Sequence, residues 1–400
     1  MNPPIRAKIL ADWFIINESN TYISHCLNKR VPKVFVTTSF GKAQGLQGRS
    51  QATINRTIFM PMPLVSVLMP VFNGEKYLTE AINSILKQTY SNFEFLILDD
   101  GSTDKSITIV QSYKDARIRH IIAPQNSGIE KTLNKGLELA QGKYIARMDC
   151  DDISLPRRLQ YQVAFMEQHP ETGVLSAAIR IMKYGYAEKV RRWPITDDAL
   201  KIHLLFYNPL SHPVVMMRKS AIDGFQYPFD CQYAEDYRLW TLLAQHTKFA
   251  NLPDVLLRYR FHPNQVTKEK SLLSHSGARK AREAYLTDLI KNISPEEILV
   301  HHQIAENKRT LNLEDAKQWL EKLARINQEK ALFSHDLFLS VLAMKWWQCC
   351  RNNKNAGVHT WRTYKASFLG NIQKNAAHHT LKYMIKWIYN DMRRVLPVTE

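Results

Sequence analysis

Cysteine is scarce in this sequence, and its pattern excludes two classes of small structured protein. The 400 residues contain five cysteines, which is an odd number. Their spacing matches neither a disulfide framework nor a zinc site. They are Cys26, Cys150, Cys231, Cys349 and Cys350. We therefore expect reduced thiols and a cytoplasmic protein.

Long apolar runs are also absent. A membrane-spanning helix needs about 20 consecutive apolar residues, whereas runs such as Leu337–Met344 are much shorter. The first residues lack the basic stretch, apolar run and small-residue cleavage site of a signal peptide. We expect a protein that spans no membrane and can at most lie on the cytoplasmic face of the inner membrane.

Acidic residues are fewer than basic residues, and most of the difference lies at the two ends of the chain. The formal net charge is +17, to which residues 1–60 contribute +6 and residues 341–400 contribute +8. The middle of the chain is therefore nearly balanced. A basic end suits an anionic membrane surface, nucleic acid or simply water, so charge alone does not choose among these partners.

From Leu64 onward, short apolar runs alternate with segments of helical periodicity. The runs are bounded by turns, and the segments between them carry apolar residues three or four positions apart. The expected strands are Leu64–Pro70, Phe93–Leu98, Ile118–Ala123 and Tyr144–Met148. This alternation predicts an α/β fold with a mostly parallel sheet and right-handed crossovers. Ligands of such sheets bind beyond the carboxyl ends of the strands.

Three regions follow from these patterns. Residues 1–62 have mixed polarity and no sustained period, so we expect a poorly defined extension, which need not belong to the mature protein. Residues 63–267 hold the strand–helix alternation and form the predicted α/β domain. Residues 268–400 change to long helical stretches such as Leu313–Ile326 and form a predicted helical, basic region.

A first acidic cluster follows the second predicted strand. Asp99 and Asp100 stand directly before Gly101, which allows a tight turn. Carboxylates at such a strand end can accept hydrogen bonds from a base or a ribose. A turn followed by helix capping explains the same residues and is favoured for this cluster taken alone.

A second acidic cluster follows the fourth predicted strand. Asp149 and Asp151 are two residues apart, so in an extended stretch they share a face. Paired carboxylates suit Mg²⁺ or Mn²⁺, which in turn binds a diphosphate. Capping of the next helix by Asp152 or Ser154 is the alternative, but a cap does not account for the acidic pair that precedes it.

Two further motifs are ambiguous when each is taken alone. Glu235 and Asp236 open a helical segment, where acidic residues also complement the helix dipole. His262 follows a predicted strand, Val255–Arg260, and a single histidine in a loop is more often structural than a ligand.

Taken in order, the motifs of residues 63–267 resemble those of the family 2 glycosyltransferases, which have the GT-A fold. The matching segments are PVFNG (70–74), LDDGSTD (98–104), NSG (126–128), GKYIARMDCDD (142–152), ISLPRRL (153–159), SHPVVMMR (211–218), AEDYRLW (234–240) and YRFH (259–262). The resemblance implies a Rossmann-like sheet and transfer of a sugar from a nucleotide-diphosphate donor with inversion at the anomeric centre. It covers half of the chain.

The resemblance also implies a donor pocket. Pro70, Phe72 and Asn73 belong to its first segment, and Phe72 would pack near the base, which we expect to be uracil. Asp100 would bond to the base, with Asp99 supporting the same pocket. Many members have an Arg-Asn pair after the N-x-G segment. This chain has Leu133-Asn134 there, so that donor contact is either missing or supplied by Lys131.

A metal site and a catalytic base follow from the same resemblance. Asp149 would face the nucleoside or the sugar and join Asp151 in binding Mn²⁺ or Mg²⁺, and His262 would lie near the metal and the diphosphate. Asp236 matches the catalytic base, and Glu235 beside it would contact the acceptor or the donor sugar. A metal neutralises the leaving diphosphate, so one positioned base suffices, whereas a glycosidase typically uses two carboxylates.

The expected acceptor is a hydroxyl of a glycan or lipid-linked sugar in the synthesis of a bacterial surface polysaccharide or lipopolysaccharide. The chain lacks the Q-x-x-R-W motif and the membrane spans of processive members, which argues against a polymerase. A nucleotidyltransferase and a non-catalytic nucleotide-sugar binding protein are the alternatives. The first lacks a glycine-rich phosphate loop, and the joint presence of Asp149, Asp151 and Asp236 speaks against the second.

The basic C-terminal end interleaves lysine and arginine with tryptophan. Residues 341–400 include Trp346, Trp347, Trp361 and Trp387. This composition suits peripheral contact with a membrane surface, and an ordinary helical cap with buried tryptophans explains it equally well. Nucleic acid is not expected, because the best-supported site belongs to sugar transfer.

Overall fold

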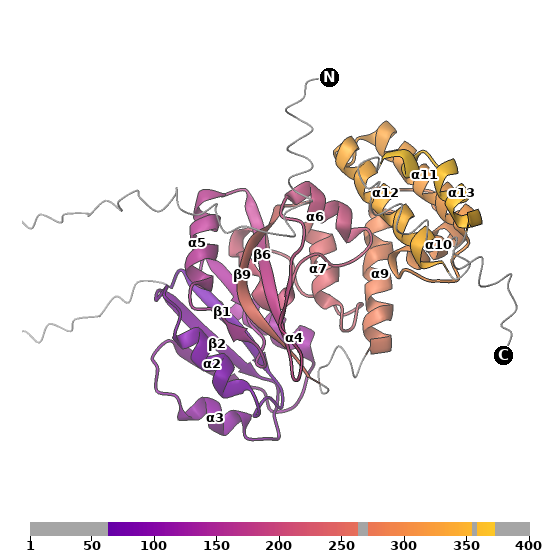
Figure 1. Cartoon of the computed structure of the whole chain (residues 1–400). Coiled ribbons are helices and arrows are strands. Elements are labelled where there is room, and N and C mark those ends of the chain that lie inside the picture. Colours follow the sequence, from indigo (N-terminus) through magenta and orange to yellow (C-terminus); the bar gives the residue numbers. More distant parts are fainter. Residues whose placement is uncertain (1–62, 263–270, 354–357, 373–400) are drawn as a thin grey trace, which may run out of the picture. The chain divides into compact units, whose positions relative to one another are not determined.

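A nine-stranded mixed sheet forms the centre of the chain (Figure 1). This computed structural model describes residues 63–262, 271–353 and 358–372. The predicted extension 1–62, the predicted boundary at 267 and residues 373–400 lie outside the described residues. The strands are β1 (Val65–Val71), β2 (Phe93–Asp99), β3 (Ile118–Ile122), β4 (Tyr144–Arg147), β5 (Ile153–Ser154), β6 (Thr172–Lys183), β7 (Lys189–Arg191), β8 (Met216–Arg218) and β9 (Lys248–Phe261).

The strand order is β3-β2-β1-β4-β8-β6-β9-β5, with β7 paired to β6. Strands β3, β2, β1 and β4 run parallel to one another, as do β6 and β9. The short strand β8 lies antiparallel between β4 and β6. The four expected strands are the four parallel ones at one end of the sheet, so the predicted α/β class with parallel crossovers is confirmed.

Helices cover both faces of the parallel part of the sheet. They are α2 (Leu78–Leu86), α3 (Ser106–Ser112), α4 (Ile129–Leu139), α5 (Arg158–Gln168), α6 (Asp197–Leu204) and α7 (Glu235–Leu243), with 3-10 turns at His212–Val214 and Lys219–Ala221. Alternate residues of β1, such as Val67 and Met69, share one apolar core with buried residues of α2, α3 and α5. On the other face, a Cβ on Gly136 of α4 would meet Leu68 Cδ1 at 2.2 Å. A larger residue at position 136 would therefore force the buried Leu68 side chain to move where α4 approaches the sheet.

The C-terminal part of the described chain is helical, as expected (Figure 1, orange to yellow). Its helices are α9 (Ser271–Leu289), α10 (Pro295–Ala305), α11 (Leu313–Lys330), α12 (His335–Asn352), α13 (Val358–Ala366) and α14 (Leu369–Ile372). Helix α9 packs on α7, and α12 packs on α6. These contacts attach the helical region to the two helices whose ends flank residues 204–236.

Buried polar groups fix this attachment. The Arg282 guanidinium donates to the Phe206 carbonyl at 3.1 Å, and His301 Nε2 donates to the Leu205 carbonyl at 2.6 Å. Trp319 Nε1 donates to the other nitrogen of His301 at 3.1 Å, so the imidazole is neutral with its proton on Nε2. Burial lowers the pKa of His301 to about 3, which agrees with that state. The helical region therefore binds the main chain of residues 205 and 206 directly.

Two residues of the basic, tryptophan-containing C-terminal end are buried in the helical region. Trp346 is fully buried and donates from Nε1 to the Tyr364 carbonyl at 3.2 Å. Lys345 is also buried, and its ammonium lies over the rings of Phe206 and Tyr207. These two residues match a helical cap rather than a membrane-facing surface. No helix in the described ranges is both long and apolar enough to cross a bilayer.

Replacing Arg282 tests the attachment of the helical region. Arg282→Ala leaves the Phe206 carbonyl without its donor and removes one of the charges paired with Glu306. We expect the free energy of unfolding, measured by urea denaturation, to fall by about 3 kcal/mol. The control is Arg279→Ala, because the Arg279 side chain is 42% exposed although it pairs with the same Glu306. Its loss should cost less than about 1 kcal/mol, and equal losses would contradict the assignment.

Candidate active site

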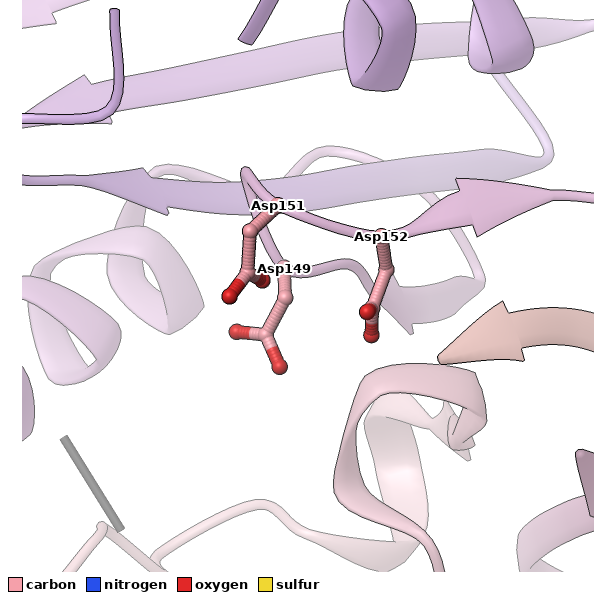
Figure 2. A group of neighbouring side chains, drawn as sticks. All are labelled: Asp149, Asp151 and Asp152. Atoms are coloured by element: carbon pink, nitrogen blue, oxygen red, sulfur yellow. The ribbon is translucent and has the colours of Figure 1, made fainter. Parts of the chain in front are cut away.

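Three carboxylates converge in the turn between β4 and β5. Figure 2 shows Asp149, Asp151 and Asp152 on the same side of this turn. One ligand oxygen from each lies within 4.8 Å of the other two. Asp149 and Asp151 are partly buried, whereas Asp152 is 1% exposed. The expected pairing of Asp149 and Asp151 on one face is therefore seen, and Asp152 completes the group.

Like charges this close repel one another, and burial removes the water that would screen them. Burial and the charge of Asp149 raise the pKa of Asp151. Burial also raises the pKa of Asp152, well above its usual value. Asp152 Oδ2 is buried and has no hydrogen-bond partner within the described part of the chain. A divalent cation would relieve the repulsion and satisfy this oxygen, so the cluster fits a hard metal ion with oxygen ligands.

The end of β9 closes one side of this acidic cluster. His262 Nε2 lies 2.9 Å from Asp151 Oδ2, which places His262 beside this predicted metal ligand. The Arg260 guanidinium donates to the Asp151 carbonyl at 2.8 Å, and the Arg260 amide donates to Asp152 Oδ1 at 2.8 Å. The Tyr77 ring contacts both residues: its centroid lies 4.4 Å from the Arg260 guanidinium and 5.0 Å from that of the tilted His262 ring.

The positions of Asp152 and Ser154 exclude the alternative that either residue caps the next helix. Helix α5 begins at Arg158 after Arg157, with no side-chain cap bond. Asp152 bonds to Arg260, and Ser154 lies in the short strand β5. Neither residue caps the helix, because an extra strand pair with β9 separates the acidic turn from α5.

Arg147, the last residue of β4, is a buried cation beside the cluster. It is 4% exposed, and its Nη1 pairs with Asp149 Oδ1. Its Nε finds no acceptor among the described residues. Buried Arg158 donates to the Arg147 carbonyl at 2.6 Å and so fixes the peptide at the end of β4. The Arg147 charge lowers the pKa values of both Glu235 and Asp236, so this guanidinium acts on a second acidic group as well as on Asp149.

That second group lies in the first turn of α7. Asp236 is held through both carboxylate oxygens: Tyr237 N–H donates to Oδ1 at 2.7 Å, and Asn208 Nδ2 donates to Oδ2 at 2.8 Å. Burial raises the pKa of Asp236, and the charge of Asp149 raises it too, whereas Arg147 and the two hydrogen bonds lower it. Burial and the Asp236 charge raise the pKa of Glu235 to about 8.

Asp99 and Asp100 belong to a different part of the site. Asp100 accepts hydrogen bonds from the amide and hydroxyl of Ser127 and from the Gly128 amide, each at 2.9 Å. Asp99 Oδ1 accepts from the Ser102 amide at 2.7 Å. Both carboxylates are buried, and they bind the turns that follow β2 and β3 rather than the acidic cluster at 149–152.

The remaining predicted donor-binding residues flank these turns. Pro70 is buried within β1, and the Phe72 side chain just beyond the strand is 47% exposed. Asn73 has a left-handed backbone with φ of 51°, and its Oδ1 accepts from the Thr103 amide at 2.8 Å. Lys131 is exposed in the first turn of α4. The Leu133-Asn134 pair points inward instead.

Asn134 has a structural role at this departure from the family pattern. Its side chain exchanges two hydrogen bonds with the main chain of Tyr227, at 2.9 and 2.7 Å. The buried Tyr227 hydroxyl in turn lies 2.9 Å from His212 Nε2. Asn134 therefore holds the segment near residue 227, which lies within electrostatic reach of Arg147 and Asp236.

Arg147 and Asn208 were not among the residues that we predicted for the site. Arg147 is two residues before Asp149, and residues two apart in an extended stretch share a face, so the sequence places Arg147 on the same face as Asp149 and Asp151. Its charge at the end of an otherwise apolar strand could have marked it as a site residue. Asn208 has no such signal, because its role depends on a contact with Asp236, 28 residues away in the sequence.

Comparisons with known proteins agree with this arrangement. The family model described as glycosyl transferase family 2 matches residues 66–223. The amylovoran biosynthesis glycosyltransferase AmsE of Erwinia amylovora is 32% identical over 215 residues, which cover 52% of this chain and 80% of AmsE. The chain belongs to glycosyltransferase family 2. Family membership sets aside the nucleotidyltransferase alternative.

Two further comparisons extend this assignment. A second relative, the UDP-Glc:alpha-D-GlcNAc-diphosphoundecaprenol beta-1,3-glucosyltransferase WfgD of Escherichia coli, is 29% identical over 215 residues, covering 52% of this chain and 81% of WfgD. The crystal structure of S. aureus TarS 1–349 in complex with UDP-GlcNAc aligns with a TM-score of 0.51 at 19% identity. That alignment covers 76% of this chain and 91% of TarS 1–349. This family 2 chain therefore has the GT-A fold.

The raised pKa of Glu235 predicts a pH dependence of stability. The carboxyl has an ordinary pKa of 4.5 when unfolded and about 8 when folded, so the native state retains a proton that the unfolded chain releases. Its stabilising contribution is complete below pH 4.5, is lost as pH rises through about 8, and is constant above. In metal-free buffer, we expect the stability of the wild type relative to Glu235→Gln to fall across this window. If the stability difference between the wild type and Glu235→Gln does not change with pH, the native Glu235 carboxyl does not hold a proton as proposed.

Proposed function

We propose that this chain is a metal-dependent, inverting glycosyltransferase that moves a sugar from a UDP-sugar to a hydroxyl of a lipid-linked glycan acceptor. One observation carries most of the proposal. The buried Arg147 pairs with Asp149 and also acts electrostatically on Glu235 and Asp236. The acidic group suited to a metal and the carboxylate suited to a base are therefore both within electrostatic reach of one buried cation, which supports transfer at a single site.

Asp236 is the proposed catalytic base. The acceptor hydroxyl must lose its proton as its oxygen attacks the anomeric carbon, and one positioned carboxylate can take that proton. The bonds from Tyr237 and Asn208 orient the Asp236 carboxylate, and Arg147 favours its charged form. Burial opposes ionisation and so increases the basicity of the group. Direct attack opposite the leaving group inverts the anomeric centre.

Asp149 and Asp151 are the proposed metal ligands, with His262 beside them. A bound Mn²⁺ or Mg²⁺ would neutralise charge on the leaving diphosphate. Asp149 would also face the nucleoside or sugar, and Glu235 would contact the acceptor or the donor sugar.

The proposed donor pocket uses Pro70, Phe72, Asn73, Asp99, Asp100 and Lys131. Its partly exposed Phe72 is suited to stacking on a base, and the buried Asp99 Oδ2 has no partner among the described residues.

The donor and acceptor are inferred from a relative. WfgD acts, by its name, with UDP-Glc on a GlcNAc-diphosphoundecaprenol. By analogy we propose a hexose or N-acetylhexosamine as the transferred sugar and a lipid-diphosphate-linked acceptor in surface polysaccharide or lipopolysaccharide synthesis. Such an acceptor lies in a membrane, so we further propose that the enzyme works at the cytoplasmic face of the inner membrane.

Replacing the proposed base tests the chemistry. Asp236→Asn keeps the shape and the bond from Asn208 at one oxygen but cannot accept the hydroxyl proton, so we expect turnover to fall about a thousandfold. Donor binding, measured by calorimetry with a UDP-sugar, should change little. The control is Asp230→Asn, because Asp230 is 62% exposed and lies six residues earlier. Turnover of Asp236→Asn within a few-fold of the wild type would refute the assignment.

Replacing a proposed metal ligand tests the cation. Asp151→Asn removes one charged oxygen ligand, so the Mn²⁺ concentration for half-maximal UDP release should rise by about tenfold or more. Asp223→Asn, at an exposed aspartate in the loop after β8, is the matched control and should leave the requirement unchanged. An equal metal requirement in Asp151→Asn and the wild type would contradict the proposed site.

A further inference from the structure

The hairpin that joins β6 to β7 is basic, aromatic and exposed. Residues 183–192 contain four cationic residues and one acidic residue. Tyr184 is fully exposed and Tyr186 is 67% exposed. Lys183 and every residue from 187 to 192 are exposed as well. Exposed tyrosines grouped with cations at one hairpin tip are suited to contact with a partner.

The charge of this hairpin is available to a partner. Its single acid, Glu188, is already paired with Arg258 at 2.5 Å and lies 3.7 Å from Arg180. Lys183 lies 4.1 Å above the Tyr186 ring, which places an ammonium and an aromatic side by side. Lys189, Arg191 and Arg192 follow on the exposed returning strand. The hairpin thus presents cations interleaved with amphipathic rings, the combination found at membrane–water interfaces.

The hairpin leaves the sheet beside the acidic cluster. In the register of β6 and β9, Lys183 is opposite Phe261. The next residue after Phe261 is His262, which contacts Asp151. The hairpin tip therefore begins at the end of β9 that closes the candidate metal site.

A lipid-linked acceptor limits how the enzyme can approach the bilayer. Its reactive hydroxyl is separated from the lipid surface only by a sugar and a diphosphate. The rim of the active site must therefore face the membrane, and a remote basic surface cannot serve. The hairpin meets this requirement, whereas Lys345 and Trp346 of the C-terminal helices are buried.

We propose that the β6–β7 hairpin, residues 183–192, docks the enzyme on an anionic bilayer surface next to its active site. Tyr184 and Tyr186 enter the headgroup region, and Lys183, Lys189, Arg191 and Arg192 contact lipid phosphates. The inference rests on the proposed lipid-linked acceptor, and it assigns to this hairpin the membrane contact that the sequence suggested for residues 341–400.

Vesicle flotation of the full-length protein tests the inference. Wild type should float with vesicles containing phosphatidylglycerol, bind weakly to pure phosphatidylcholine, and lose binding as salt screens the charges. Lys189→Gln with Arg192→Gln should weaken binding roughly thirtyfold, and Tyr184→Ser with Tyr186→Ser about tenfold or more. These side chains are exposed, so the variants should fold normally. Their metal-dependent UDP release from a UDP-sugar should match that of the wild type.

Matched controls test whether vesicle binding depends on the hairpin itself or on any exposed cation or aromatic side chain. Lys291→Gln with Arg309→Gln removes two exposed cations of the helical region, and Phe368→Ser removes an aromatic that is 45% exposed. Both should bind vesicles as the wild type does. The proposal is overturned if the hairpin variants bind as tightly as the wild type, if anionic lipid makes no difference, or if the wild type binds a single-stranded DNA oligonucleotide and not the vesicles.

The assay needs neither donor nor acceptor, so it also separates two kinds of failure. Vesicle binding that depends on the hairpin, combined with no UDP release from any UDP-sugar, would reject the proposed function and not the docking surface. Hairpin variants that bind normally in an active enzyme would reject the docking surface alone.

Discussion

Arg147 balances an unusual concentration of buried negative charge, and the arrangement of the candidate site depends on it. Three carboxylates follow β4 and two more open α7, and burial alone would drive protons onto most of them. The guanidinium at the end of β4 pairs with Asp149 and lowers the pKa values of Glu235 and Asp236. This cation therefore offsets part of the effect of burial, which favours protonation of Glu235 and Asp236.

The helical C-terminal region contributes to the same site although it holds none of the acidic residues. Arg282 and His301 bind the main-chain carbonyls of residues 206 and 205. Asn208 follows two residues later and donates to Asp236. Contacts from α9 and α10 therefore hold the main chain two residues before the side chain that bonds to the proposed base. In physical terms the sheet and the helices form one functional unit.

Much of this site could be predicted from local sequence patterns. Apolar runs ending in acidic residues located the carboxyl ends of β2 and β4, and the two-residue spacing placed Asp149 beside Asp151. The alternative of a helix cap at Asp152 or Ser154 is not seen, because the pairing of β5 with β9 brings Arg260 from more than a hundred residues away to bind the Asp152 carboxylate. Asn208 and the attachment through Arg282 also depend on long-range packing, which no spacing in the sequence encodes.

The central claim is that both acidic groups open onto one cavity that holds the sugar donor and its metal ion. Anomalous diffraction from crystals grown with Mn²⁺ and a non-hydrolysable UDP-sugar would test it most directly. The account predicts a manganese peak in contact with Asp151 and the diphosphate, with the Asp236 carboxylate facing the anomeric carbon in the same cavity. A peak bound elsewhere, or an Asp236 that opens onto a surface away from the donor, would contradict it.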